Sequence, residues 1–198
     1  MGEAPVKILH IDSSILGEAS ASRALTREIV SHLKAKHADA EVAYLDLAAG
    51  DLPHLSPQSL ARSDEAEAAR NNQALEQFLA AEVVVIGAPI YNFSIPSQLK
   101  AWIDRISVAG RTFRYTAAGP EGLAGGKEII VAMSRGGVSA AADRGEFSES
   151  YLRFLFGFLG ITRVRFVHAE ALNISPQHRE ASLKAAHAAI ASGQALAA

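Results

Sequence analysis

The chain has 198 residues, of which 49% are apolar and 20% charged, and its formal net charge is −2, so we expect one globular domain (residues 1–198) without a basic surface for nucleic acid. The sequence contains no cysteine, which excludes disulfides, iron–sulfur clusters and cysteine nucleophiles and leaves any redox chemistry to a bound cofactor. No apolar stretch approaches the ~20 residues of a membrane span, and the N-terminus lacks the features of a signal peptide, so we expect a cytoplasmic protein.

The first part of the chain predicts strands that alternate with helices. We expect strands over residues 6–11 and 42–45 and helices over residues 22–37 and 64–80. A long polar segment over residues 48–63 separates the second strand from the second helix. This alternation is typical of a parallel sheet with crossover helices.

The clearest strand covers residues 83–86, where consecutive apolar residues are typical of a strand buried on both faces. We expect it to break at Gly87, with a loop after it that carries aromatic side chains. After Pro96, apolar residues at helical spacing predict an amphipathic helix. The loop residues of interest are Pro89, Ile90, Tyr91, Asn92 and Phe93.

The later part of the chain begins with the glycine-rich residues 110–126, which we interpret as an irregular functional loop. A strand over residues 128–133 follows, and it ends in Ser134, Arg135, Gly136 and Gly137. The remaining expected elements are a helix over residues 147–159, a strand over residues 162–169 and a last helix from residue 176 to the C-terminus.

Five strands alternating with helices imply a parallel sheet covered by helices on both faces. We therefore predict a flavodoxin-like three-layer α/β/α fold with a five-stranded parallel sheet in the order 2-1-3-4-5. In this order the direction of winding reverses between the first and third strands, where open α/β sheets bind ligands. A ligand is therefore expected across the loops after the first, third and fourth strands.

The loop after the first strand has the composition of an anion site. Ser14, Ser20 and Ser22 supply neutral hydroxyl donors, and the segment, which includes Ala21, leads into a helix N-terminus that favours an anion. No G-x-G-x-x-G or Walker motif is present, so a monophosphate is preferred to a dinucleotide. The ordinary alternative is that Ser22 caps the helix and the other serines only fill the loop.

The loops after the third and fourth strands add a flat apolar surface and backbone donors. Tyr91 and Phe93 follow the end of a central strand and suit a planar ring, and the amide of Asn92 suits the edge of that ring. Core aromatics and a simple turn are the alternatives for these residues. Glycines at 136 and 137 let backbone amides approach a ligand closely, although they are equally compatible with a plain turn.

The expected helix over residues 147–159 carries two apolar stripes, which predict two partners: the sheet and a second subunit. Complete burial of this helix is the alternative. One stripe consists of Leu152, Leu155, Phe156 and Leu159, and the other of Tyr151, Phe154 and Phe158. The seven histidines show no metal-ligand spacing, so we predict no metal site.

A serine hydrolase with Ser13 or Ser14 as its nucleophile is an alternative from another class, because an Asp-Ser pair after the first strand resembles the serine block of certain small lipases. Those lipases have a glycine before the aspartate and a late Asp-x-x-His pair. Here no such glycine is present, and the only such pair, Asp51 and His54, comes far too early. Residues 137–141 do not form a complete nucleophile elbow either.

Taken together and in order, these motifs resemble those of the FMN-dependent NADH-azoreductase family, a branch of the flavodoxin-like quinone reductases. The resemblance covers essentially the whole chain. Its most specific segments are SSIL (13–16), SAS (20–22), APIYNF (88–93), QLK (98–100), TFRYT (112–116), GPEGL (119–123) and SRGG (134–137).

The resemblance implies a bound FMN, with NADH or NADPH as electron donor and quinones and azo compounds as substrates. It implies ping-pong hydride transfer through the flavin, which reduces quinones to hydroquinones and cleaves azo bonds to amines. It places Ser14 and residues 20–22 at the phosphate and ribityl end of FMN. It places residues 89–93 along the flavin ring, with Asn92 near the reactive edge, and residues 134–137 on the pyrimidine side.

The resemblance also implies a homodimer, whose substrate pocket lies over the exposed flavin face and is lined by Tyr115 and Phe158. The chain departs from the family pattern at Ala21, a position where relatives carry polar residues, and in a short segment after Asp51 that borders the pocket. The second departure concerns substrate preference and leaves the expectation of flavin binding unchanged.

A flavodoxin-type electron carrier without a small-molecule substrate is the alternative function. Such carriers are usually markedly acidic so that they dock on their partners, whereas the charges of this chain nearly balance. Residues 110–126 are also long enough to build a pocket. We therefore prefer the enzyme.

Overall fold

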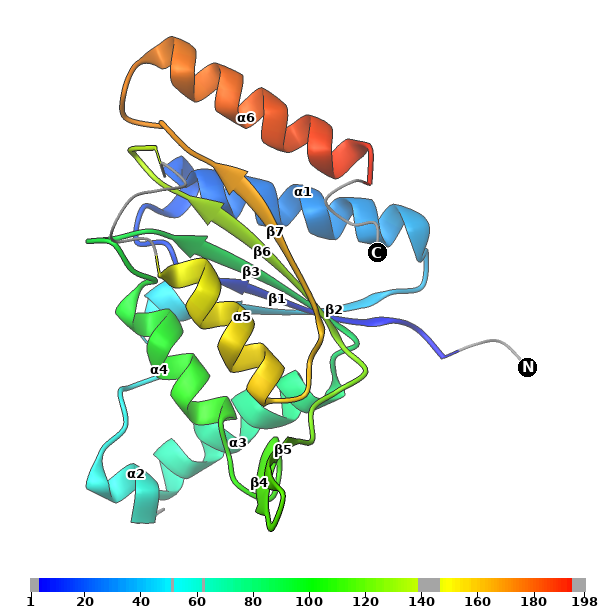
Figure 1. Ribbon diagram of the computed structural model, residues 1–198, viewed down its shortest axis with the longest axis vertical. Helices are drawn as coiled ribbons and strands as arrows, with labels where there is room; N and C mark the ends of the chain where they lie inside the picture. The colour runs from blue at the N-terminus through cyan, green and yellow to red at the C-terminus, as the bar shows by residue number, and fades with distance from the viewer. Residues whose placement is uncertain (1–3, 51, 62, 139–146, 194–198) are drawn as a thin grey trace.

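A central parallel sheet lies between two layers of helices in the computed structural model, which describes residues 4–50, 52–61, 63–138 and 147–193 (Figure 1). Its five strands lie in the order β2-β1-β3-β6-β7. Counted within this sheet, that is the predicted order 2-1-3-4-5, and all neighbouring pairs are parallel. The strands are β1 Lys7–Asp12, β2 Glu41–Asp46, β3 Val83–Pro89, β6 Glu128–Ser134 and β7 Arg163–Ala169.

Helices cover both faces of the sheet (Figure 1). On one face lie α1 (Ala21–Lys36) and α6 (Pro176–Ala191). On the other lie α3 (Glu65–Ala80), α4 (Ser97–Ile106) and α5 (Ser148–Phe158). The short elements are α2 (Pro57–Ala61), η1 (Gly17–Ala19) and η2 (Leu47–Ala49), of which α2 and η2 fall in the predicted polar segment.

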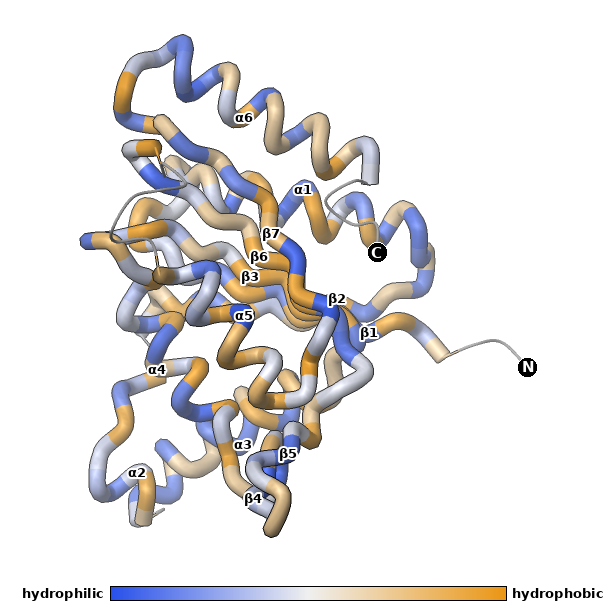
Figure 2. Tube along the Cα trace, in the orientation of Figure 1, coloured by the Kyte–Doolittle hydropathy of each residue, from blue (hydrophilic) through white to orange (hydrophobic). Residues whose placement is uncertain are grey.

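Each face of the sheet has its own apolar core, as the strand periodicity requires. Leu25 and Ile29 of α1 are fully buried in the cluster on one face. On the other face, Phe78 and Trp102 are fully buried and meet edge to face, with their ring centroids 5.7 Å apart. Figure 2 shows the central strands as the most hydrophobic part of the chain.

Strand β3 is longer than the sequence predicts, because it continues through Gly87 and Ala88 to Pro89 instead of breaking at Gly87. It stays paired with β6 to its end, where Pro89 lies opposite Ser134. The glycine marks a close approach rather than a turn, since a Cβ at Gly87 would lie 2.8 Å from Asp12 Oδ1 on β1. The corrected boundary moves the site loop to the residues after Pro89.

Residues 110–126 contain an antiparallel hairpin rather than the predicted irregular loop. Its strands, β4 (Phe113–Thr116) and β5 (Gly119–Gly122), lie outside the main sheet (Figure 1). Strands of four residues with a glycine at each end of β5 have too little apolar alternation to be recognised. The hairpin is packed tightly on the end of α5, since a Cβ at Gly122 would lie 2.1 Å from the backbone nitrogen of Gly160.

Candidate functional site

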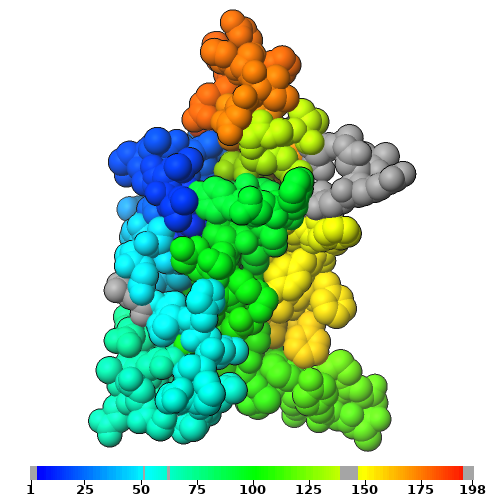
Figure 3. Space-filling model, turned by 90° about the vertical axis from the view of Figure 1, so that its left-hand side faces the viewer, coloured from blue at the N-terminus to red at the C-terminus, as the bar shows by residue number. Residues whose placement is uncertain are grey.

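Four loops meet around a cavity of about 150 Å³ at the carboxyl end of the sheet, which we call the loop cavity. Figure 3 views this face and shows the segments after β1, β3, β6 and β7 side by side. The lining residues are Ser14, Leu16, Ala19, Ser20 and Ala21 after β1; Pro89 at the end of β3, with Ile90 and Tyr91 after it; Ser134 at the end of β6, with Arg135 and Gly136 after it; and Leu172, Asn173 and Arg179 after β7. The ligand position predicted from the strand order therefore coincides with a cavity in the structure.

Most of the predicted site residues line the loop cavity, and the others divide into two groups. Ser22, Asn92, Phe93 and Gly137 are next to lining residues in the chain without lining the cavity themselves. Tyr115 and Phe158 also do not line it, and both contact the ring of Phe113, at centroid distances of 5.6 and 4.8 Å. In Figures 1 and 3 the hairpin lies well away from the loops of the cavity.

The segment after β1 forms the end of the cavity that is suited to bind an anion. Ser20, rather than Ser22, is the N-cap of α1, and its Oγ accepts a hydrogen bond from Arg23 N at 3.3 Å. The Oγ atoms of Ser20 and Ser22 are 3.1 Å apart, and Ser22 is fully buried. Within the described part of the chain, the amides of Ala21 and Ser22 donate to no acceptor. They are therefore free to bind an anion.

Two hydroxyl groups join the loop after β1 to the loop after β3. Ser14 Oγ lies 3.0 Å from the hydroxyl oxygen of Tyr91, which also accepts a hydrogen bond from the Ile15 amide at 3.3 Å. Ser14 is fully buried and Tyr91 is half-buried. The two loops therefore form one wall of the cavity.

The loop after β3 is a tight turn with an unusual backbone. Tyr91 and Ser94 exchange backbone hydrogen bonds of 2.9 and 3.1 Å across Asn92 and Phe93. Both central residues have positive φ, 49° and 69°, as in a type I′ turn. Asparagine tolerates this region, but phenylalanine rarely adopts it, so the turn stores strain. The Phe93 side chain is 78% exposed, which rejects the core interpretation for this ring.

The loop after β6 is held by the loop after β7, which sequence reasoning did not assign to the site. The amide of Asn173 donates to Gly136 O at 2.9 Å, and the amide of Ala171 donates to Gly137 O at 2.7 Å. A Cβ at Gly136 would lie 2.5 Å from Asn173 Nδ2, so glycine is needed for this close contact. The predicted strand order could have indicated this loop, because β7 is the neighbour of β6 and ends at the same edge of the sheet.

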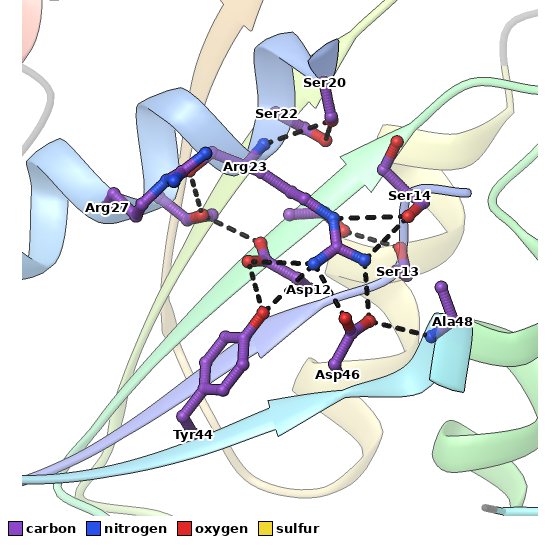
Figure 4. A network of polar contacts seen from close by, with 12 residues as sticks. Asp12, Ser13, Ser14, Ser20, Ser22, Arg23, Arg27, Tyr44, Asp46 and Ala48 are labelled. Atoms are coloured by element: carbon purple, nitrogen blue, oxygen red, sulfur yellow. Dashed lines mark hydrogen bonds and ion pairs between the residues drawn. The ribbon is translucent and has the colours of Figure 1, made fainter. Parts of the chain in front are cut away.

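A buried arginine fixes the loop after β1 to the edge of the sheet (Figure 4). The Arg23 guanidinium binds both carboxylate oxygens of Asp46, at 2.7 and 2.8 Å. Its Nε and Nη2 donate to the carbonyl oxygen of Ser14, at 3.2 and 2.8 Å. The bond to Asp46 raises the pKa of Arg23. Sequence reasoning missed this contact because Arg23 and Asp46 lie on separate elements.

Beneath this arginine, a buried carboxylate completes the network (Figure 4). Asp12 accepts hydrogen bonds from Thr26 Oγ1 at 2.8 Å and from the Tyr44 hydroxyl at 3.2 Å. Burial raises the pKa of Asp12, but His10, through hydrogen bonding and charge, together with Thr26 and Arg23, outweighs it and holds that pKa below its ordinary value. Burial and the charge of Asp12 raise the pKa of Tyr44 to about 12.

Ser13 does not have the environment of a nucleophile. It is fully buried, and its Oγ donates to Gly87 O at 2.6 Å, which holds it against the sheet. Asp51 of the Asp-x-x-His pair and Ser139 lie outside the described residues. The Oγ of Ser14 contacts the Tyr91 hydroxyl and the Leu16 amide, and no described histidine or carboxylate bonds to it. The hydrolase alternative therefore has no support from either serine after β1.

Across the described ranges, no group of three or more His, Cys, Asp or Glu residues could hold a metal ion. No described helix is both long enough and apolar enough to cross a membrane.

Comparison with known proteins gives consistent relatives over nearly the full length. A family model described as a flavodoxin-like fold matches residues 6–193. The FMN-dependent NADH:quinone oxidoreductase of Xanthomonas oryzae pv. oryzae (strain MAFF 311018) is 56% identical over 189 residues, covering 96% of this chain and 97% of the relative. The protein of the same name from Rhizobium meliloti (strain 1021) is 54% identical over 202 residues, covering 96% of this chain and 98% of the relative.

Solved structures of azoreductases have the same fold as this chain. The azoreductase of Bacillus anthracis str. Sterne superimposes with a TM-score of 0.84 at 31% identity, covering 94% of this chain and 97% of that one. An FMN-dependent NADH-azoreductase from Bacillus anthracis str. Ames Ancestor, solved in complex with FMN, gives a TM-score of 0.83 at 26% identity and covers 94% of this chain and 98% of its own.

Proposed function

We propose that this chain, which belongs to the flavodoxin-like FMN-dependent NADH-azoreductase family, is itself an FMN-dependent NADH:quinone oxidoreductase that also cleaves azo compounds to amines. The observation that carries the proposal is the loop cavity, which combines an anion-binding end built of hydroxyl groups and free amides with an apolar wall at the carboxyl edge of the sheet. Because the electron donor is NADH, a metabolite of the cytoplasm, we propose that the protein is located in the cytoplasm.

The residues around the loop cavity fit FMN. Ser14, Ser20 and the free amides of Ala21 and Ser22 supply uncharged donors at a helix N-terminus, which suits a phosphate monoester. Pro89 and Ile90 are apolar, which suits the flavin ring. Of the residues that do not line the cavity, Asn92 and Phe93 are exposed in the turn beside it, where they can reach a bound ring.

The protein's part in the reaction is binding, orientation and charge stabilisation. FMN held in the loop cavity would supply the redox chemistry, which is hydride transfer between NADH and a quinone or azo compound. Among the described residues, the amides of Gly136 and Gly137 donate to no acceptor, so they can stabilise negative charge on the pyrimidine side of the ring. Arg135 adds no free charge there, because it pairs with Glu170 at 3.4 Å.

The proposal includes a homodimer. Phe154 of α5 is 76% exposed and Tyr115 of the hairpin is 75% exposed, which leaves large apolar surface without a partner in the described chain. Tyr115 and Phe158 do not line the loop cavity of their own chain, and in the proposed homodimer they would lie over the flavin of the second chain. The second chain would cover Phe154 of the second apolar stripe of α5, whereas Tyr151 and Phe158 of that stripe already pack against the core of their own chain.

Spectroscopy tests the proposal. The purified protein is reconstituted with FMN, its visible spectrum is recorded, and NADH is added without oxygen. We expect the yellow flavin spectrum to bleach and to return when benzoquinone is added, with continuous turnover when NADH is in excess. Absence of FMN binding would refute the proposal. A carrier protein would give slow reduction and no steady turnover of benzoquinone or of an azo dye.

A further inference from the structure

Arg179 is a cation that pairs with no acidic group among the described residues. It lies in the first turn of α6 and its side chain lines the loop cavity, together with Ser14, Ser20 and Ala21. The residue is half-buried. In the part of the chain that the structure describes, its guanidinium forms no hydrogen bond and no ion pair.

Two other described arginines near the cavity, Arg23 and Arg135, already pair with carboxylates. Arg23 is turned away from it, onto Asp46 and the carbonyl oxygen of Ser14. Arg135 lines the cavity but pairs with Glu170. Among the described residues that line the cavity there is no aspartate or glutamate, so within this part of the chain Arg179 adds a positive charge that no lining carboxylate compensates.

The position of Arg179 in its helix makes that charge costly without a ligand. The first turn of α6 contains no acidic residue, and a cation there opposes the helix dipole, which favours anions at this end. This turn and the segment after β1 line the same cavity, through Arg179 and Ser20. An anion bound between these two segments would be compensated by both helix N-termini and by the guanidinium.

We propose that Arg179 is a specificity-determining residue that pairs with the phosphate of the cofactor and so selects FMN over uncharged riboflavin. This inference rests on the proposed function. A phosphate monoester carries a charge of about −1.5 to −2 at pH 7, and the serine hydroxyls and free amides of the cavity supply donors without charge. Arginine supplies a positive charge as well as donors, because its planar guanidinium bonds two phosphate oxygens at once.

The test compares dissociation constants for FMN and riboflavin, measured by quenching of flavin fluorescence. For Arg179→Gln we expect the FMN constant to rise roughly tenfold, the loss of one charge-assisted contact, while the riboflavin constant stays unchanged. Arg179→Lys keeps the charge and should recover part of the loss. In the wild type, added salt should weaken FMN binding more than in Arg179→Gln. Lys184→Gln is the matched control, since it removes the same charge from an exposed site on α6.

Three outcomes would overturn the inference. Equal FMN affinity of wild type and Arg179→Gln would make Arg179 a solvent-facing side chain. Equal weakening of FMN and riboflavin would make its role structural. A rise in the KM for NADPH with unchanged FMN affinity would assign it to the electron donor. If the wild type binds neither flavin, the proposed function fails as well, which distinguishes that failure from the other three.

Discussion

Arg23 connects the proposed phosphate loop to strand β2 through a planar, bidentate contact. Arg23→Lys keeps the charge but cannot bind Asp46 and the Ser14 carbonyl oxygen at the same time. We expect a loss of about 1–3 kcal/mol in the free energy of unfolding, measured in urea, and weaker FMN binding because Ser14 is no longer held. Arg27→Lys is the control: Arg27 pairs with Glu18 at the surface, and a change within about 0.5 kcal/mol is expected. Equal effects of the two substitutions would contradict this role.

Asp12 makes stability depend on pH. Its pKa in the folded protein lies below its ordinary value of 3.8, so its ionised form stabilises the fold above that pH, and the contribution is lost as the pH falls through the lowered pKa. For Asp12→Asn we expect a less stable protein at pH 7 and a shallower loss of unfolding free energy between about pH 5 and pH 3. Asp39→Asn, at an exposed site, should follow the wild type. Parallel curves for the wild type and Asp12→Asn would refute the assignment.

At the scale of elements, the hairpin is attached to α5 by a contact between backbones. The amide of Ala124 donates to Leu159 O at 2.9 Å, and a Cβ at Gly122 would lie 2.1 Å from the Gly160 nitrogen. Gly122→Ala should therefore lower the free energy of unfolding by about 1–3 kcal/mol or more, since backbone atoms have to move. Gly157→Ala, in α5, has no atom within 4 Å of the new methyl group and should raise stability by about 0.4–1 kcal/mol. Thermal unfolding of both variants measures this, and a neutral Gly122→Ala would be inconsistent with the tight contact.

The whole molecule leaves the rings of Phe154 on α5 and Tyr115 on the hairpin exposed, and we attribute this to a second copy of the chain. Phe154→Asp should prevent association because it would bury a charge in an apolar contact. We expect sedimentation equilibrium to change from two chains to one and benzoquinone turnover to fall, while FMN binding in the loop cavity persists. Lys184→Asp, on the helix layer of the opposite sheet face, should leave both unchanged. A Phe154→Asp variant that still forms the wild-type assembly would contradict this interface.

Local patterns were sufficient for most of the fold. The apolar run at residues 83–86 predicted a buried parallel strand, and helical spacing after Pro96 predicted α4, because burial on both faces or on one stripe leaves a direct mark on the sequence. The β4–β5 hairpin left no such mark, since its short strands are largely exposed. The end of β3 was misplaced because Gly87 resembles a break and is in fact a close contact with Asp12.

The amino-acid pattern alone predicted the alternation of strands and helices, because each element leaves its own periodicity in neighbouring residues, and general rules for parallel α/β sheets then predicted the strand order and three of the loops around the cavity. The folded arrangement was needed for contacts between distant elements: the hold of Arg23 on Ser14 and Asp46, the loop after β7, and Arg179 facing the proposed phosphate end. Such contacts depend on distances between side chains from different strands and helices, and periodicity along one segment carries no information about them.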